Sequence, residues 1–108
     1  MAYVKIKPGV DISNLAPEIT KYLWETANAF DELGHECVIT SARRPADAKF
    51  SWHQYGKAID LRANHIARRT DVDKILAKLK VIYGSDYDII AHGSGPNFHF
   101  HIEYDPDG

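Results

Sequence analysis

The strongest constraint on the fold is a seven-residue run, FHFHIEY at residues 98–104, in which apolar and polar side chains alternate. Successive side chains of a β-strand point to opposite faces of its sheet. The run therefore predicts a strand with one face in the core and one polar face. The core face would carry Phe98, Phe100 and Ile102, and the polar face would carry His99, His101 and Glu103.

Two stretches of helical periodicity supply the second layer that such a strand needs. Residues 17–33 begin with a proline at a favourable first helical position and are followed by Gly34, a helix stop. A second helix is predicted to begin at Thr70, with Asp73 three positions later as a variant of the capping box, and to end at Gly84. We expect both helices to pack on one sheet.

The sheet is expected to hold four or five strands. Short β-rich runs are found at residues 1–8 (an edge strand stopped by Pro8), 36–41, 57–61, 87–91 and 98–104. Residues 92–97 (HGSGPN) are rich in turn formers and predict a hairpin between the last two strands. The predicted fold class is α+β, two helices on a mainly antiparallel sheet, and residues 1–108 are expected to form one domain.

The charge balance and the cysteine content exclude several classes of protein. The formal net charge is -2, so the basic excess typical of nucleic-acid-binding proteins is missing. No apolar run approaches the roughly 18 residues of a membrane span. Cys37 is the single cysteine, which excludes an intrachain disulfide and a thiolate-rich zinc site. The N-terminal segment is unlike a secretory signal peptide, so we expect a cytoplasmic protein that must be released before it acts outside the cell.

A second motif, SWHQYGKAIDL at residues 51–61, places His53 in a loop and Asp60 within an apolar strand. A carboxylate in such a strand needs a cation or several donors. His53, Asp60 and one histidine of the 98–104 run would supply a ligand set that suits a catalytic zinc ion. Two plainer interpretations stand beside this one. Asp60 would be satisfied by Arg43, Arg44 or backbone amides, and the polar stripe of the last strand would be an ordinary solvent-facing surface.

These residues resemble the M15 family of zinc peptidases, which includes D-alanyl-D-alanine carboxypeptidases, D-Ala-D-Ala dipeptidases and the L-alanyl-D-glutamate endopeptidases of phage endolysins. The family pattern is Ser-x-His-x-x-Gly-x-Ala-x-Asp, followed far downstream by a closing histidine, often in His-x-His. Residues 40–44 (TSARR) are similar to the family's Ser-Gly-Tyr-Arg segment, and residues 98–104 supply the closing histidine. The fixed positions of the first part are filled by Ser51, His53, Gly56, Ala58 and Asp60.

The resemblance implies one Zn2+ ion held by His53, Asp60 and His101, on an α+β scaffold similar to that of M15 peptidases and hedgehog domains. It also implies Arg44 as the anchor for a substrate carboxylate or carbonyl. Arg43 is the rival for this role, because a run of two arginines is not aligned by sequence alone. Ser51 would lie near the substrate or support the ligand loop. The position of Trp52, between Ser51 and His53, suits a wall of the substrate groove, with packing as the plainer interpretation.

The general base is the point at which this chain departs from much of the family. An acidic residue commonly lies three positions before the last ligand, and here that position is Phe98. Other members carry His-x-His, which makes His99 the preferred base. Glu103 and Asp88 remain alternatives, and Glu103 would otherwise orient a ligand from behind.

The expected function is therefore that of a zinc metallopeptidase that hydrolyses a peptide bond of peptidoglycan stem peptides, of the D-Ala-D-Ala or L-Ala-D-Glu type. Phage lysis, as an endolysin, or cell-wall remodelling would be the setting, and a monomer is expected. The alternative is a non-catalytic zinc-binding domain that recognises a wall peptide or a protein partner, since hedgehog domains keep the metal. The cationic stretch at residues 62–69 is expected to be a solvated face, with attraction to an anionic wall polymer as the second interpretation.

Overall fold

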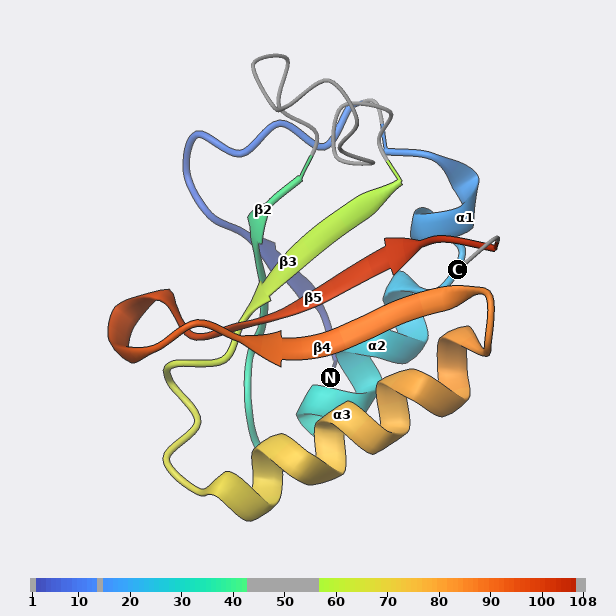
Figure 1. The fold of residues 1–108 in the computed structure, drawn as a ribbon. Helices are drawn as coiled ribbons and strands as arrows, with labels where there is room; N and C mark the ends of the chain where they lie inside the picture. Colours follow the sequence, from blue (N-terminus) through green and yellow to red (C-terminus); the bar gives the residue numbers. More distant parts are fainter. Residues whose placement is uncertain (1, 14, 43–56, 107–108) are drawn as a thin grey trace.

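The structure, a computed structural model, describes residues 2–13, 15–42 and 57–106. These residues form one five-stranded sheet with the strand order β1-β2-β3-β5-β4 (Figure 1). In chain order the elements are β1 (Val4–Ile6), α1 (Pro17–Thr20), α2 (Leu23–Asp31), β2 (Cys37–Ser41), β3 (Ala58–Arg62), α3 (Arg69–Tyr83), β4 (Tyr87–His92), the 3-10 helix η2 (Gly95–Asn97) and β5 (His99–Tyr104).

The predicted mainly antiparallel sheet is confirmed. β2 pairs antiparallel with β3, β3 with β5 and β5 with β4, whereas β1 lies at the edge and runs parallel to β2. β3 is thus the central strand, with a hydrogen-bonded neighbour on each side. The predicted hairpin is also confirmed, because η2 lies in the connection between β4 and β5.

The prediction of one continuous first helix is wrong. The expected helix over residues 17–33 is divided into α1 and α2, and Tyr22 between them has a non-helical backbone (φ -109, ψ 6). The Tyr22 ring packs edge-on against Tyr83, with ring centroids 4.9 Å apart. Ile19 of α1 is fully buried. Tertiary packing of Tyr22 and Ile19 therefore accompanies a break that apolar periodicity alone does not reveal.

The predicted capping box at the start of α3 is also wrong. The N-cap is Arg68, and no side-chain hydrogen bond caps the helix. Asp73 instead accepts a hydrogen bond from Arg69 Nε at 3.2 Å, an i,i+4 ion pair on the exposed helix surface. The predicted end is confirmed, because Gly84 follows the helix with φ +85, a conformation that favours glycine.

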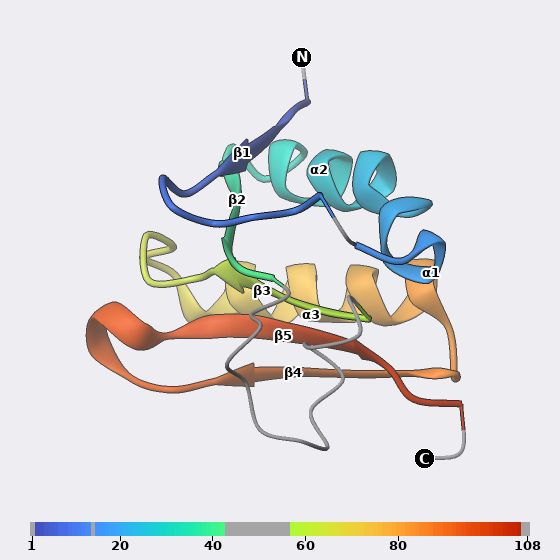
Figure 2. The same ribbon diagram turned by 90° about the horizontal axis from the view of Figure 1, so that it is seen from above.

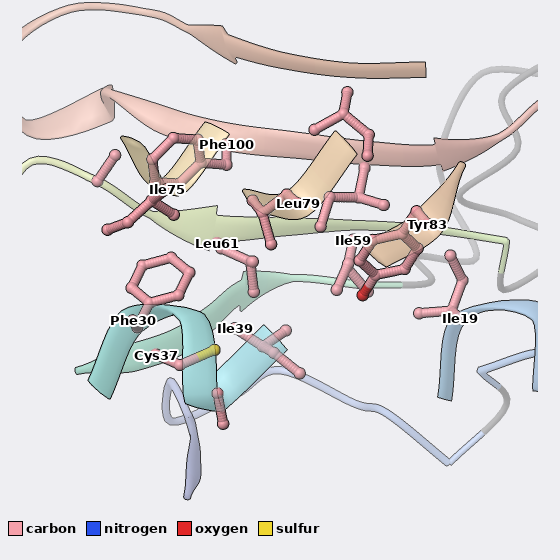
Figure 3. Packing of buried hydrophobic residues seen from close by; sticks show 14 of the residues in the cluster. Ile19, Phe30, Cys37, Ile39, Ile59, Leu61, Ile75, Leu79, Tyr83 and Phe100 are labelled. Atoms are coloured by element: carbon pink, nitrogen blue, oxygen red, sulfur yellow. The ribbon is translucent and has the colours of Figure 1, made fainter. Parts of the chain in front are cut away.

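Helices α2 and α3 contact each other and lie on the same face of the sheet (Figures 1 and 2). Between helices and sheet lies one hydrophobic core (Figure 3). The Phe30 ring of α2 meets the Phe100 ring of β5 edge-on, with centroids 5.6 Å apart. The largest fully buried core residues include Ile19, Phe30, Ile39, Ile59, Leu61, Ile75, Leu79, Phe100 and Ile102.

The face of the sheet opposite α2 and α3 is called the outer face below. On β5, Phe100 and Ile102 are fully buried, while the alternating positions 99, 101 and 103 are partly exposed. The predicted alternation is confirmed, except that Phe98 precedes the strand and packs against the core only half-buried. None of the helices in the described ranges combines the length and the apolar character that crossing a membrane requires.

Candidate active site

The ladder between the central strand and β5 brings the predicted polar residues together on the outer face. Asp60 of β3 lies directly opposite His101 of β5, and Arg62 lies opposite His99. Directly opposed residues of neighbouring strands project to the same face of a sheet. The alternation of β5 adds Glu103 to the same row. The alternation of β5 and the pairing of β3 with β5 thus bring four predicted site residues to one face. They are Asp60, His99, His101 and Glu103.

His101 lies between two carboxylates. Its Nδ1–H donates to Asp60 Oδ1 at 2.7 Å, and its Nε2–H donates to Glu103 Oε1 at 2.9 Å. The Asp60 and His101 side chains are only 16% and 19% exposed. The hydrogen bond to Asp60 is the main reason that the pKa of His101 rises from 6.5 to about 9, and Glu103 adds to it against the opposing effect of burial. The described arrangement therefore favours an imidazolium ion at this position.

His99 is held differently. Its Nδ1–H donates to the backbone carbonyl of Asn97 at 2.6 Å, and its Nε2 faces Asp60 Oδ1 at 3.8 Å. In the neutral ring the proton therefore lies on Nδ1, which leaves the Nε2 lone pair directed toward Asp60. A backbone carbonyl that fixes the tautomer in this way is a common support of both histidine ligands and histidine bases.

Gly93 makes the carbonyl contact of His99 possible. It has φ +90, and a Cβ atom at this position would lie 2.5 Å from the Asn97 carbonyl oxygen. Only glycine therefore fits the turn that brings Asn97 to His99. The composition of residues 92–97 predicts the turn but no particular role for Gly93 or Asn97. The signal for them was the glycine and asparagine content of residues 92–97.

A groove of about 590 Å3 borders Asp60 and His99. Its lining includes Thr40 and Ser41 of β2, and Thr40 Oγ1 donates to the Asp60 carbonyl at 3.4 Å. Sequence analysis missed this groove, because its walls come from segments that are far apart in the chain. Its remaining lining residues are Lys7, Arg62, Asn64, His65, Pro96, Asn97 and Phe98.

The alternative bases occupy distinct places. Glu103 contacts His101 as described above, whereas Asp88 of β4 lies opposite Glu103 in the ladder and is exposed. Phe98 packs against the core and has the Arg69 guanidinium 5.9 Å from its ring centroid. Phe98 therefore contributes an aromatic side chain to the wall of the groove.

Five predicted site residues lie outside the described residues. They are the zinc ligand His53 and the substrate contacts Arg43, Arg44, Ser51 and Trp52. In residues 2–13, 15–42 and 57–106, no three His, Cys, Asp or Glu side chains are grouped as ligands of one metal ion. The zinc hypothesis therefore requires His53 in addition to the residues placed above.

The donor set that the structure does describe fits zinc in its chemistry. One carboxylate oxygen, Asp60 Oδ1, lies 2.7 Å from the Nδ1 of His101 and 3.8 Å from the Nε2 of His99. Imidazole nitrogen and carboxylate oxygen are ligands that Zn2+ accepts. His101 has both ring nitrogens bound to carboxylates, so it would have to release one of them to bind a metal. In the tautomer described above, His99 Nε2 carries the lone pair that either a metal ligand or a general base needs.

His35 and the groove-lining His65 each have a hydrogen-bond partner, and Cys37 is buried. His35 pairs with Asp71 at 2.9 Å, and His65 Nε2–H donates to the Glu36 carbonyl at 2.9 Å. Cys37 is buried, and burial raises the pKa of its thiol to about 12.

Comparison with models of known protein families gave no match to this chain. Searches of curated proteins and of solved structures likewise gave none.

Proposed function

We propose that this chain is a zinc-dependent peptidase of the M15 type that hydrolyses a bond of peptidoglycan stem peptides. The observation that carries the proposal is the convergence of His99 and His101 on one oxygen of Asp60, beside a groove. The spacing of Ser51, His53 and Asp60 in the M15-like motif supports the metal and the reaction class. An M15/hedgehog-like scaffold, a monomeric state and release from the cytoplasm onto the cell wall belong to the same proposal.

His53, Asp60 and His101 would hold the ion, as the motif implies. Zinc in such a site supplies Lewis-acid activation of a water molecule and of the scissile carbonyl. The chain's own part is to hold the ligands in place, and the flanking strand ladders do this for Asp60 and His101. Glu103 would accept the Nε2 proton of His101 and orient its ring, as carboxylates near ligating histidines commonly do.

His99 is the proposed general base. Its Nε2 would accept a proton, while the bond from Nδ1–H to Asn97 keeps the ring oriented. Glu103 is the alternative base, and Asp88 is less suited because it is exposed. Arg44, or its neighbour Arg43, would bind the substrate carbonyl or carboxylate, with Ser51 and Trp52 beside it. The bond cleaved is of the D-Ala-D-Ala or L-Ala-D-Glu type.

The central test removes one ligand at a time. We expect Asp60→Ala and His53→Ala to lose stoichiometric zinc and to lose hydrolysis of defined muropeptides, because each removes a donor from a three-ligand site. Zinc is measured by elemental mass spectrometry and cleavage by mass spectrometry of the products. Asp86→Ala, an exposed carboxylate on the loop before β4, is the matched control and should keep both. Full activity in metal-free Asp60→Ala protein would end the proposal.

The roles of the two histidines are separated by comparing metal content with turnover. His101→Gln should lose zinc, whereas His99→Gln should keep zinc and lose kcat, because a base acts only on the reaction. The reverse pattern would exchange the two assignments, with His99 as the ligand. Retention of zinc and activity in both variants would show that neither His99 nor His101 is needed for zinc binding or catalysis.

A non-catalytic zinc-binding domain is the second candidate, favoured by one observation. Phe98 packs against the core at the position where much of the M15 family has its acidic base. Zymography on purified peptidoglycan separates the two functions. Clearing that a chelator abolishes supports the peptidase, whereas stoichiometric zinc without released peptide supports the binding domain.

A further inference from the structure

The two edges of the sheet are protected to different degrees. β1 is three residues long, its Lys5 forms an ion pair with Glu36, and Pro8 follows two positions after its end. Short length, charge and proline are devices that keep an edge strand from pairing with other chains. β4 has six residues in continuous register with β5, contains neither lysine nor proline, and carries Ile90 at 43% exposure. The β4 edge therefore lacks these protective features.

The main-chain groups on the open side of β4 follow from its pairing with β5. The Asp105 N–H donates to the Asp86 carbonyl at 2.8 Å, and hydrogen-bonded pairs recur at every second residue of an antiparallel ladder. The even-numbered residues of β4 therefore turn their main-chain groups toward β5. The N–H and carbonyl groups of Ile89 and Ala91 are directed away from β5, to the side on which the described ranges contain no further strand.

The side chains of this edge form a pattern on the outer face. Asp88, Ile90 and His92 alternate there and are all exposed, with an acid at one end, an aliphatic centre and an imidazole at the other end. An antiparallel strand added here would place its side chains directly opposite these three. Its best complement is a base opposite Asp88, an aliphatic residue opposite Ile90 and an acid opposite His92. Along the added strand the order is acid-x-aliphatic-x-base.

The position of α3 decides which kind of chain fits the β4 edge. α3 contacts β4 and lies on the inner side of the sheet behind this strand (Figures 1 and 2). A second whole copy, paired through its own β4 about a two-fold axis, would bring its own α3 into the same space. A single extended segment carries no such helix and would extend the sheet over α3. The edge therefore suits a short segment of another protein.

We propose that β4 is a docking edge for an extended segment of a partner protein with the pattern acid-x-aliphatic-x-base, which adds to the sheet antiparallel to β4. Main-chain hydrogen bonds would supply affinity, and alternate side chains would supply specificity. The inference goes beyond the proposed peptidase and does not depend on it, because Asp60, His99 and His101 take no part in the docking.

The test uses a capped peptide with the core Glu-Thr-Ile-Thr-Lys and follows the backbone amides of the isotope-labelled protein by NMR. We expect saturable shifts at the Ile89 and Ala91 amides, because both would donate to the peptide. The matched peptide Glu-Thr-Ile-Thr-Glu places an acid opposite Asp88 and should bind roughly threefold to tenfold more weakly. Asp88→Lys protein should reverse this order. Equal affinities of the two peptides for the wild type, or no shift at either amide, would overturn the proposal.

Methylation of the peptide nitrogens tests the direction of the main chain. The two threonine N–H groups would donate to the carbonyls of Ile89 and Ala91, so methylation of both should abolish binding. The isoleucine N–H would point away from β4, and its methylation should weaken binding far less. Equal losses in the two methylated peptides would contradict the proposed ladder.

A substitution at the centre of the β4 edge completes the test. Ile90→Lys adds the charge that protects natural edges and should weaken binding by at least about tenfold. Ile6→Lys on β1 is the matched control, because Ile6 is 42% exposed at the opposite edge, and it should bind as the wild type does. Retained binding in Ile90→Lys protein would overturn the proposal.

Self-association is measured in the free protein by sedimentation equilibrium. We expect a monomer. A dimer that Ile90→Lys dissociates would assign the β4 edge to a second copy and overturn the proposal. If Ile90→Lys does not fold, as judged from its amide spectrum, the methylated peptides decide with the wild-type protein alone.

Discussion

The two faces of the same strands are built by opposite chemistry. On the inner face of β3 and β5, Ile59, Leu61, Phe100 and Ile102 are fully buried against the helices. On the outer face, one residue away along each strand, the positions are held by hydrogen bonds among ionisable groups. The inner face is specified by shape and area, which depend on the whole core. The outer face is specified by a few donor and acceptor atoms at defined distances.

Adjacent residues of one strand therefore serve different purposes. One contributes to the stability of the core, and the next contributes to the chemistry of the outer face. Neighbouring substitutions on β5 should therefore act on different properties of the protein. Inner-face changes should lower the free energy of unfolding. Outer-face changes should alter its pH dependence and, under the proposed function, metal content or turnover.

The largest effect is expected on the inner face, for Phe100→Ala. The Phe100 ring is fully buried and contacts Phe30, so its loss leaves a cavity. We expect a decrease of about 3–5 kcal/mol in the free energy of unfolding, measured by urea denaturation. Val81→Ala is the control, because Val81 is 84% exposed and its loss should change stability by less than about 0.5 kcal/mol. Similar values for the two variants would contradict the proposed division of the faces.

The next effect is a pH dependence that originates on the outer face. In the metal-free protein the pKa of His101 is raised to about 9 from 6.5. A raised pKa stabilises the folded state fully below pH 6.5, and this stabilisation is lost as the pH rises through 9. The loss should be about 2–3 kcal/mol.

Asp60→Asn tests this dependence, since Asp60 is the main cause of the shift. Urea denaturation between pH 6 and 10 with a chelator should give a flatter profile for the variant. Glu103→Gln keeps Asp60 and should retain most of the wild-type slope. Equal slopes for the wild type and Asp60→Asn would show that the His101–Asp60 contact does not govern the profile.

A smaller effect is expected where the hairpin turn supports the outer face. Gly93→Ala places a Cβ against the Asn97 carbonyl and strains a backbone at φ +90. We expect a loss of about 1–3 kcal/mol in stability, with a further loss of turnover, because the partner of His99 is displaced. Gly34→Ala is matched in backbone strain, with φ +78 and open space around a Cβ, and should lower stability without changing turnover. Unchanged turnover in Gly93→Ala protein would show that the hydrogen bond from His99 to the Asn97 carbonyl is not needed for the reaction.

The smallest effect concerns a polar contact on the helix side. Thr26 Oγ1–H donates to the Tyr22 carbonyl at 2.7 Å, so the Tyr83 hydroxyl donates to Thr26 Oγ1, also at 2.7 Å. Tyr83→Phe should cost about 1 kcal/mol in thermal or urea unfolding and leave any peptidase activity intact. Tyr3→Phe, at a side chain that is 56% exposed, should have no measurable effect. A loss of activity in Tyr83→Phe would show that a contact on the helix side of the sheet affects the candidate site on the outer face.

The sequence predicted those features that a local pattern encodes. The alternation of residues 98–104 gave both faces of β5, and the periodicity of residues 70–82 gave most of α3. The break at Tyr22 was missed because it accompanies contacts with rings of α3 and β4. The parallel pairing of β1 was missed because no local signal distinguishes it.

For the candidate site as well, residue types and spacing were predictable from the sequence, whereas contacts made across the sheet were not. Asp60, His99, His101 and Glu103 were named from residue type and spacing, and their approach depends on the register of β3 with β5. That Glu103 binds the same ring as Asp60 was not predicted, since strand period gives a shared face and no contact distances. The groove was not predicted, because its lining residues come from segments that are far apart in the chain and that only the folded sheet brings together.

The position of Asp60 in the middle of the sheet has a consequence for heat inactivation. β3 has a bonded strand on either side, so its amides should exchange with solvent only when the whole domain opens. Asp60 should therefore keep its position until the sheet itself unfolds. Under the proposed function, heating should leave activity intact until the cooperative unfolding transition, and activity and folded structure should then be lost within the same few degrees.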